Sequence, residues 1–66
     1  MKKIEVQTYC GDEVFDSIRE AQKYAKYLSS RTQFRGCGVK VSVDHYFRYI
    51  YVNGRAIPES KWSRFI

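Results

Sequence analysis

Hydrophobic and polar residues alternate along the start of the chain. The residues on the less polar side are Ile4, Val6, Thr8 and Cys10. A period of two with one polar side is typical of a half-buried strand. The pattern therefore predicts a first strand over residues 4–10, which Gly11-Asp12-Glu13 ends.

The spacing of apolar positions then changes to three and four. Ser17 and Glu20 have the spacing of a capping box, in which both side chains bond free backbone N–H groups at a helix start. The apolar or small positions that follow are Ile18, Ala21, Ala25, Leu28 and Thr32. They predict one amphipathic helix over residues 17–32, whose small centre lets it lie close to a sheet.

The second half of the chain predicts a hairpin. Valines alternate with polar residues over 39–43, and a β-prone run fills residues 46–52. Asn53-Gly54 then favours a type I′ turn, so a short strand is expected at 55–57. A helical turn is expected at 58–62. The residues expected to pack back onto the core are Trp62, Phe65 and Ile66.

These elements give the order β-α-β-β-β within one domain, residues 1–66. The expected class is α+β: a single two-layer domain with one α-helix packed on a mainly antiparallel sheet of three to four strands. If the first two strands are parallel neighbours, the helix is a right-handed crossover. The order of the strands within the sheet stays open.

Aromatic residues are 17% of the 66 residues, and three of them alternate along the predicted third strand. Phe47, Tyr49 and Tyr51 share one face, and Ile50 and Val52 share the other. If the aliphatic face meets the helix, the three aromatics line the open side of the sheet. Aromatics placed there stack nucleobases or anchor protein interfaces. The alternative is that the C-terminal segment covers them.

The net charge of +5 is unevenly distributed. Residues 1–20 hold three bases and five acids, 3 − 5 = −2, and residues 21–66 hold nine bases and two acids, 9 − 2 = +7. At about 100° per residue, the first three helix bases lie within roughly 60° of one another on the outer face. Such a surface either is simply solvated or attracts phosphates or an acidic protein. The candidate basic residues are Arg19, Lys23 and Lys26 on the helix, Arg31 and Arg35 at its exit, and Arg48 and Arg55 near the aromatics.

Few residues point to catalysis or to a metal. Cys10 and Cys37 are too few for a disulfide scaffold and are expected as small packed thiols, with a redox role as the alternative. His45 is the only histidine, so a zinc site is not expected. We expect His45 to lie in a turn at the surface. Cys37 beside Arg35 is expected at a strand entry rather than as a nucleophile. We therefore expect no enzyme, no cofactor and no metal.

The run Ser17-Ile18-Arg19-Glu20-Ala21-Gln22-Lys23-Tyr24-Ala25 leads to a glycine turn, a valine-rich strand and an aromatic hairpin. This arrangement resembles small proteins of phages and mobile elements. Among them the chain is similar to some type I anti-CRISPR proteins with one helix against an antiparallel sheet. The resemblance implies a non-enzymatic inhibitor that docks on a CRISPR surveillance complex. Because the chain is basic, mimicry of DNA by charge is not expected. An inhibitor of this kind would instead meet an acidic patch, touch bound RNA or DNA, or bind through its own aromatics.

Two binding functions are therefore expected. The first is an interaction protein that modulates a protein or ribonucleoprotein complex through the aromatic strand, Arg48 and Arg55. The second is a module that binds DNA or RNA directly through the helix bases and the helix exit. No stretch approaches the roughly 18 to 20 apolar residues of a membrane span, and the N-terminus lacks a signal-peptide core. A cytoplasmic location, in the host cell for a phage protein, and a monomer or homodimer are expected.

Overall fold

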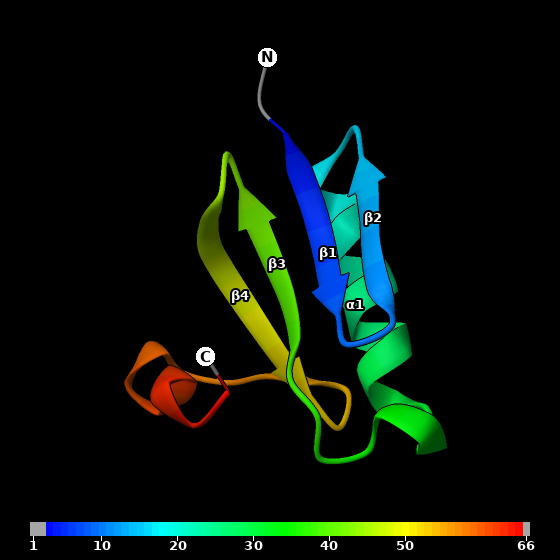
Figure 1. The fold of residues 1–66 in the computed structure, drawn as a ribbon, viewed down its shortest axis with the longest axis vertical. Helices are drawn as coiled ribbons and strands as arrows, with labels where there is room; N and C mark the ends of the chain where they lie inside the picture. Colours follow the sequence, from blue (N-terminus) through cyan, green and yellow to red (C-terminus); the bar gives the residue numbers. More distant parts are fainter. Residues whose placement is uncertain (1–2, 66) are drawn as a thin grey trace.

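A computed structural model describes residues 3–65 of the chain, and it shows an α+β fold with five strands in one antiparallel sheet (Figure 1). The strand order across the sheet is β2-β1-β3-β4-β5. The strands are β1 (Ile4–Thr8), β2 (Gly11–Phe15), β3 (Val39–Val43), β4 (Tyr46–Val52) and β5 (Arg55–Ala56). The helix α1 (Ile18–Ser30) lies between β2 and β3 in the chain. Two 3-10 helices, η1 (Thr32–Phe34) and η2 (Glu59–Arg64), follow α1 and β5.

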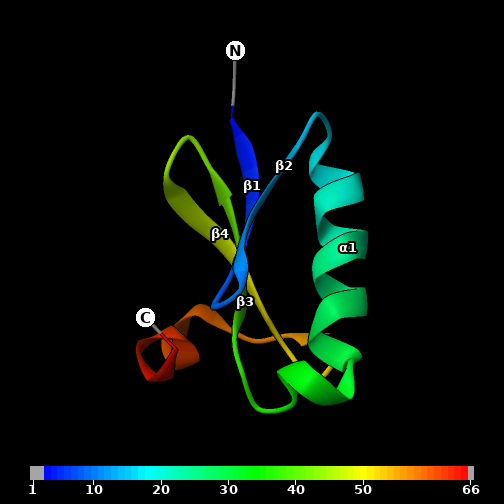
Figure 2. The ribbon, with the colours of Figure 1, turned by 45° about the vertical axis from the view of Figure 1, so that its right-hand side comes forward.

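The helix covers one face of the sheet, and the C-terminal segment lies on the opposite side (Figure 2). Ala21 and Ala25 are completely buried, which lets the helix backbone approach the strands closely. The side chains that form this core are Ile4, Val6, Ala21, Ala25, Val39, Val41, Val43 and Tyr51. The predicted packing of a small-centred helix on a valine-rich sheet is confirmed. Within residues 3–65, no helix has both the length and the apolar character needed to cross a membrane.

The strand β2 is the largest difference from the sequence-based prediction. Residues 11–13 are expected only to end the first strand, but they begin a second strand, which pairs with β1 from Thr8↔Gly11 to Ile4↔Phe15. The turn lies earlier, at Tyr9 and Cys10, and the first strand ends at Thr8. All residues of β2 except Phe15 are exposed, so the strand has no apolar alternation to reveal it. The chain order is therefore β-β-α-β-β-β.

Several smaller boundaries also differ. The helix ends at Ser30 rather than residue 32, and Thr32 is exposed in η1. Ser17 is the N-cap residue, but its side chain makes no cap hydrogen bond with the described residues, so the predicted capping box is wrong. β1 and β3 are antiparallel, so the helix is not a parallel crossover. The predicted Asn53-Gly54 turn is supported by positive φ angles of 53° and 81°.

The prediction that Tyr49 and Tyr51 lie on the open sheet face is wrong. Tyr51 pairs with Val39 and Tyr49 pairs with Val41, so both tyrosines point to the helix side with those valines. Tyr51 is only 8% exposed, and Tyr49 is half-buried against the core. These two tyrosines are therefore core residues.

The other face of β4 is covered as well. Ile50 pairs with Lys40 on the side away from the helix, yet its side chain is completely buried. A register shift in the pairing of β3 with β4 leaves Arg48 unpaired and places Phe47 opposite Ser42. Because both faces of β4 bury apolar groups, hydrophobic alternation could not decide which face met the helix.

The C-terminal segment is attached to the sheet through specific contacts. The indole Nε1 of Trp62 donates to the carbonyl oxygen of Ile57 at 3.3 Å. Phe65 lies so close to Gly38 that a Cβ at that glycine would be 2.9 Å from the Phe65 Cβ. Trp62 and Phe65 are both half-buried, but neither belongs to the core cluster onto which they are predicted to pack. Ile66 lies outside the described residues. The helical turn expected at 58–62 is present as η2.

Candidate nucleic-acid interface

The outer face of α1 carries three bases from successive turns. Arg19, Lys23 and Lys26 are all exposed, while Ala21 and Ala25 on the opposite side are buried. The buried alanines fix the rotation of the helix, and that rotation directs the three bases to solvent. The predicted basic stripe on the helix is therefore confirmed as a surface.

The C-terminal end of α1 meets the turn between β4 and β5. The backbone N–H of Gly54 donates to Ser29 Oγ at 2.9 Å, and that of Gly36 donates to Asn53 Oδ1 at 3.0 Å. These bonds bring the helix end, the segment after η1 and the hairpin turn together. A depression of about 350 Å³ lies among them. Its lining residues are Ser30, Arg31, Thr32, Arg35 and Asn53.

The 3-10 helix η1 holds the chain between the two arginines of this depression. Phe34 is 3% exposed, and its ring centroid lies 5.3 Å from that of Tyr9. The Tyr9 hydroxyl donates to the carbonyl oxygen of Gln33 at 3.0 Å. Desolvation and the nearby thiol of Cys10 raise the pKa of the Tyr9 hydroxyl. The buried phenylalanine and this bond anchor the backbone that carries Arg35.

Tyr27 adds an aromatic ring to the same region. Arg31 Nη1 donates to the Tyr27 hydroxyl at 2.7 Å, and the guanidinium carbon lies 5.5 Å from the ring centroid. Tyr27 is 55% exposed, so the ring remains open to solvent. Aromatic rings beside bases are the platform on which single-stranded nucleic acids stack. We call the set of Arg19, Lys23, Lys26, Tyr27, Arg31 and Arg35 the basic surface.

The charges of the basic surface are not neutralised within the described part of the chain. Both ion pairs found among residues 3–65 involve Glu5, so no base of this surface has a carboxylate within 4.0 Å. The carbonyl end of a helix carries roughly half a negative charge. Arg31 and Arg35 together carry two positive charges there. The arginines therefore dominate the local field, which is positive.

The remaining predicted site residues are not brought together. Arg55 is exposed on β5, next to the turn that contacts the helix end. Arg48 lines a separate depression with Ile18 and Val43. Phe47 is half-buried, and the Lys40 ammonium lies 5.7 Å from its ring centroid. Tyr49 and Tyr51 belong to the core, so the expected aromatic binding strand does not exist as a surface.

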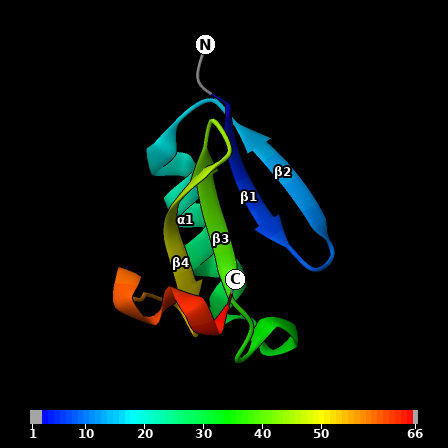
Figure 3. The same ribbon diagram turned by 60° about the vertical axis from the view of Figure 1, so that its left-hand side comes forward.

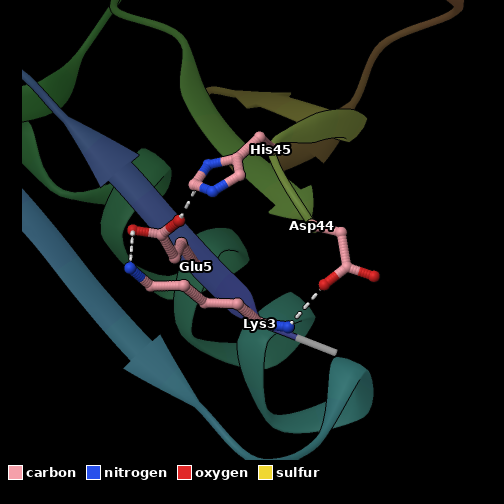
Figure 4. A network of polar contacts seen from close by, with 4 residues as sticks. All are labelled: Lys3, Glu5, Asp44 and His45. Carbon is pink, nitrogen blue, oxygen red and sulfur yellow. Dashed lines mark hydrogen bonds and ion pairs between the residues drawn. The ribbon is translucent and has the colours of Figure 1, made fainter. Parts of the chain in front are cut away.

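Glu5 is a polar residue that sequence reasoning missed (Figure 4). It is 6% exposed, on β1, although its position in the alternation suggested a solvated side chain. Lys3 Nζ lies 4.0 Å from Glu5 Oε2, and His45 Nδ1 lies 3.9 Å from Oε1. Asp44 points away and accepts the Lys3 backbone N–H at 2.8 Å. His45 is thus an exposed turn residue, as predicted, but its carboxylate neighbour is Glu5.

This network is a poor candidate for an active site. Ser42 pairs with Glu5 across β1 and β3 and is completely buried, so a substrate cannot reach its hydroxyl. Ser42 Oγ and Glu5 Oε1 have no hydrogen-bond partner among the described residues. Cys10 is exposed, against expectation, and Cys37 is half-buried; both are free thiols. No group of three His, Cys, Asp or Glu side chains in residues 3–65 could hold a metal ion.

Comparison with known proteins assigns no family to this chain. It matches no protein-family model, no curated protein and no solved structure. The resemblance to type I anti-CRISPR proteins therefore stays a prediction. The geometry and charge of the basic surface carry the functional argument.

Proposed function

We propose that this protein is a non-catalytic binding module that contacts the sugar–phosphate backbone of DNA or RNA through its basic surface. One observation carries the proposal. Five exposed bases on and after α1 have no carboxylate within ion-pair distance among residues 3–65. A polyanion would neutralise these charges and gain free energy from the release of its counterions.

The spacing of the helix bases supports contact with the backbone rather than with base edges. Arg19 and Lys26 are seven residues apart, which is about 10 Å along the helix axis. Phosphates follow one another at a rise of about 3.4 Å per strand, so the stripe faces several of them. Contacts of this kind position a nucleic acid without reading its sequence.

The resemblance to type I anti-CRISPR proteins adds a second candidate function. In this form the protein is an inhibitor that docks on a CRISPR surveillance complex by contacting its RNA or DNA. The burial of Tyr49 and Tyr51 favours this route over a contact through the aromatics of β4. The positive sign of the basic surface suits a partner that displays phosphates.

Fluorescence anisotropy with a labelled single strand and a matching duplex tests the first function. Between about 50 and 200 mM salt, log K should fall linearly with log salt, with a slope of about −0.7 per contact for a single strand. Lys23→Ala/Lys26→Ala should reduce that slope by about 1.4. Lys61→Ala/Arg64→Ala is the matched control, because it removes the same charge from exposed positions of η2.

Absence of binding to any of these ligands at about 50 mM salt would overturn direct nucleic-acid binding. Equal loss in the two double variants would show that net charge, and not the basic surface, determines affinity. Inhibitor function is tested separately, with a purified type I surveillance complex that carries its guide RNA. Binding to that complex which Lys23→Ala/Lys26→Ala does not weaken would overturn the second candidate.

A further inference from the structure

The outer edge of β2 is a free strand edge. β2 pairs only with β1, and on its other side no described residue continues the sheet (Figure 3). Such an edge presents a row of unpaired backbone N–H and C=O groups. The opposite edge strand, β5, has only two residues, so β2 offers the longer row.

This edge carries charge but lacks the other features that commonly protect edge strands. Those other features are proline, bulges and very short length. β2 reads Gly-Asp-Glu-Val-Phe, and its pairing with β1 is continuous over all five residues. Val14, the fourth of the five residues, is 61% exposed. The edge is therefore unbulged, accessible and partly apolar.

The charge of the edge selects among possible partners. Asp12 and Glu13 are both exposed, and successive residues of a strand point to opposite faces. An antiparallel second copy centred on the strand would set Glu13 against Glu13, and like charges directly opposite each other are unfavourable. A strand that carries lysine or arginine on both faces would instead meet an acid on each face.

We propose that β2 accepts an extended basic segment of a partner protein as a sixth strand of the sheet. Backbone hydrogen bonds along the free edge would supply the binding. Basic side chains beside Asp12 and Glu13, and an apolar side chain beside Val14, would supply the selectivity. The site is separate from the basic surface, so it stands whether or not the protein binds nucleic acid.

The test is an NMR titration of isotopically labelled protein with a seven-residue peptide of lysine and valine. Its sequence places lysine on both faces of the strand and a valine on the face that meets Val14. Shift changes and slowed amide exchange should be confined to residues 11–15 and the neighbouring β1. A peptide N-methylated on every backbone nitrogen should not bind, because neither of its two edges can donate to β2. A peptide with glutamate in place of lysine should also fail to bind.

Variants separate the strand edge from general charge. Asp12→Asn/Glu13→Gln should weaken the lysine–valine peptide about tenfold, as expected for two lost surface ion pairs. Asp16→Asn/Glu20→Gln removes the same charge beyond the strand and should change affinity less than about twofold.

Four results would overturn the proposal. The first two are an absence of NMR shift changes at about 1 mM peptide and equal binding of the N-methylated peptide. The third is a set of shift changes centred outside residues 11–15. The fourth is a dimer, detected by sedimentation, in which the β2 amides are protected from exchange before any peptide is added. The last result would mean that a second copy occupies the edge.

Discussion

The basic surface and the β2 edge are two exposed regions of opposite charge and different construction. The basic surface consists of long side chains that project from a helix. The β2 edge consists of backbone groups, flanked by Asp12 and Glu13. The net charge of +5 is therefore a sum over separate surfaces, and a partner meets one of them rather than the total.

The two constructions should respond differently to solution conditions. Exposed charges are screened over about 10 Å at 0.1 M salt, so binding at the basic surface should weaken steeply with salt. Backbone hydrogen bonds are short and directional, so binding at the β2 edge should depend less on salt. The two regions should also be sensitive to different substitutions. Changes of charge should disrupt the basic surface, and loss of a backbone N–H group should disrupt the β2 edge.

The largest expected effect comes from reversing charge at the helix end. Arg31→Glu/Arg35→Glu should weaken binding of a single strand about a hundredfold near 50 mM salt, because two phosphate contacts become repulsions. Asp12→Lys/Glu13→Lys reverses two charges on β2 and should not weaken that binding. Anisotropy titrations measure both. Similar losses in the two variants would mean that the regions are not distinct.

Proline substitutions should distinguish the two sides of the edge strand. Neighbouring residues of a strand point their N–H groups to opposite edges, so only one of Glu13→Pro and Val14→Pro should break a bond to β1. That variant should lose about 1–3 kcal/mol in the free energy of unfolding, measured with urea. The other should stay near wild type in stability but lose peptide binding. Equal destabilisation by both would contradict a free edge at β2.

A glycine substitution should affect the basic surface without affecting the β2 edge. Gly54 has φ of +81°, and an added Cβ would lie 3.2 Å from the Ser30 Cβ. Gly54→Ala should cost about 1–2 kcal/mol in unfolding free energy and weaken binding of a single strand. Gly36→Ala is the control, with φ of +78° but no described atom within 4 Å of the added Cβ. If both cost the same, close packing of the turn against the helix end contributes nothing.

The smallest expected effect lies in the core between the two regions. Burial raises the pKa of Tyr51, and a hydrogen bond with Gln22 lowers it in part. The folded protein thus favours the neutral phenol, so this stabilisation is complete below pH 10.0, the ordinary pKa, and is lost as pH rises through the folded-state pKa. Tyr51→Phe should reduce the loss of stability at alkaline pH in chemical unfolding. It should leave both binding activities unchanged. Loss of binding would contradict the assignment of Tyr51 to the core.

Much of the fold was predictable where periodicity was strong. The valines of β3, the alanine-centred stripe of α1 and the Asn53-Gly54 turn each have a local signal that the structure bears out. β2 had none, because an exposed edge strand needs no apolar face. The sides of β4 were assigned wrongly because both are buried, and only the pairing of Tyr49 and Tyr51 with β3 decides between them.

The candidate sites were predictable only where the residues are close in the chain. The period of an α-helix alone places three bases on one face: Arg19, Lys23 and Lys26. The depression at Arg31 and Arg35 depends on Asn53 and Gly54, which lie distant in the chain and arrive through tertiary hydrogen bonds. Burial of Glu5 likewise depends on the turn that carries His45.

The position of β1 inside the sheet has a consequence for the order in which the sheet can form. β1 pairs with β2 nearby in the chain, from Thr8↔Gly11 to Ile4↔Phe15, whereas its inner neighbour β3 spans Val39–Val43. A two-stranded hairpin alone is marginally stable in water, so β1 and β2 gain a stable partner only when β3 docks. Until then both edges of the hairpin are unpaired. The acids of β2 disfavour a second copy at the outer edge, whereas the inner edge is closed only by the pairing of β1 with β3.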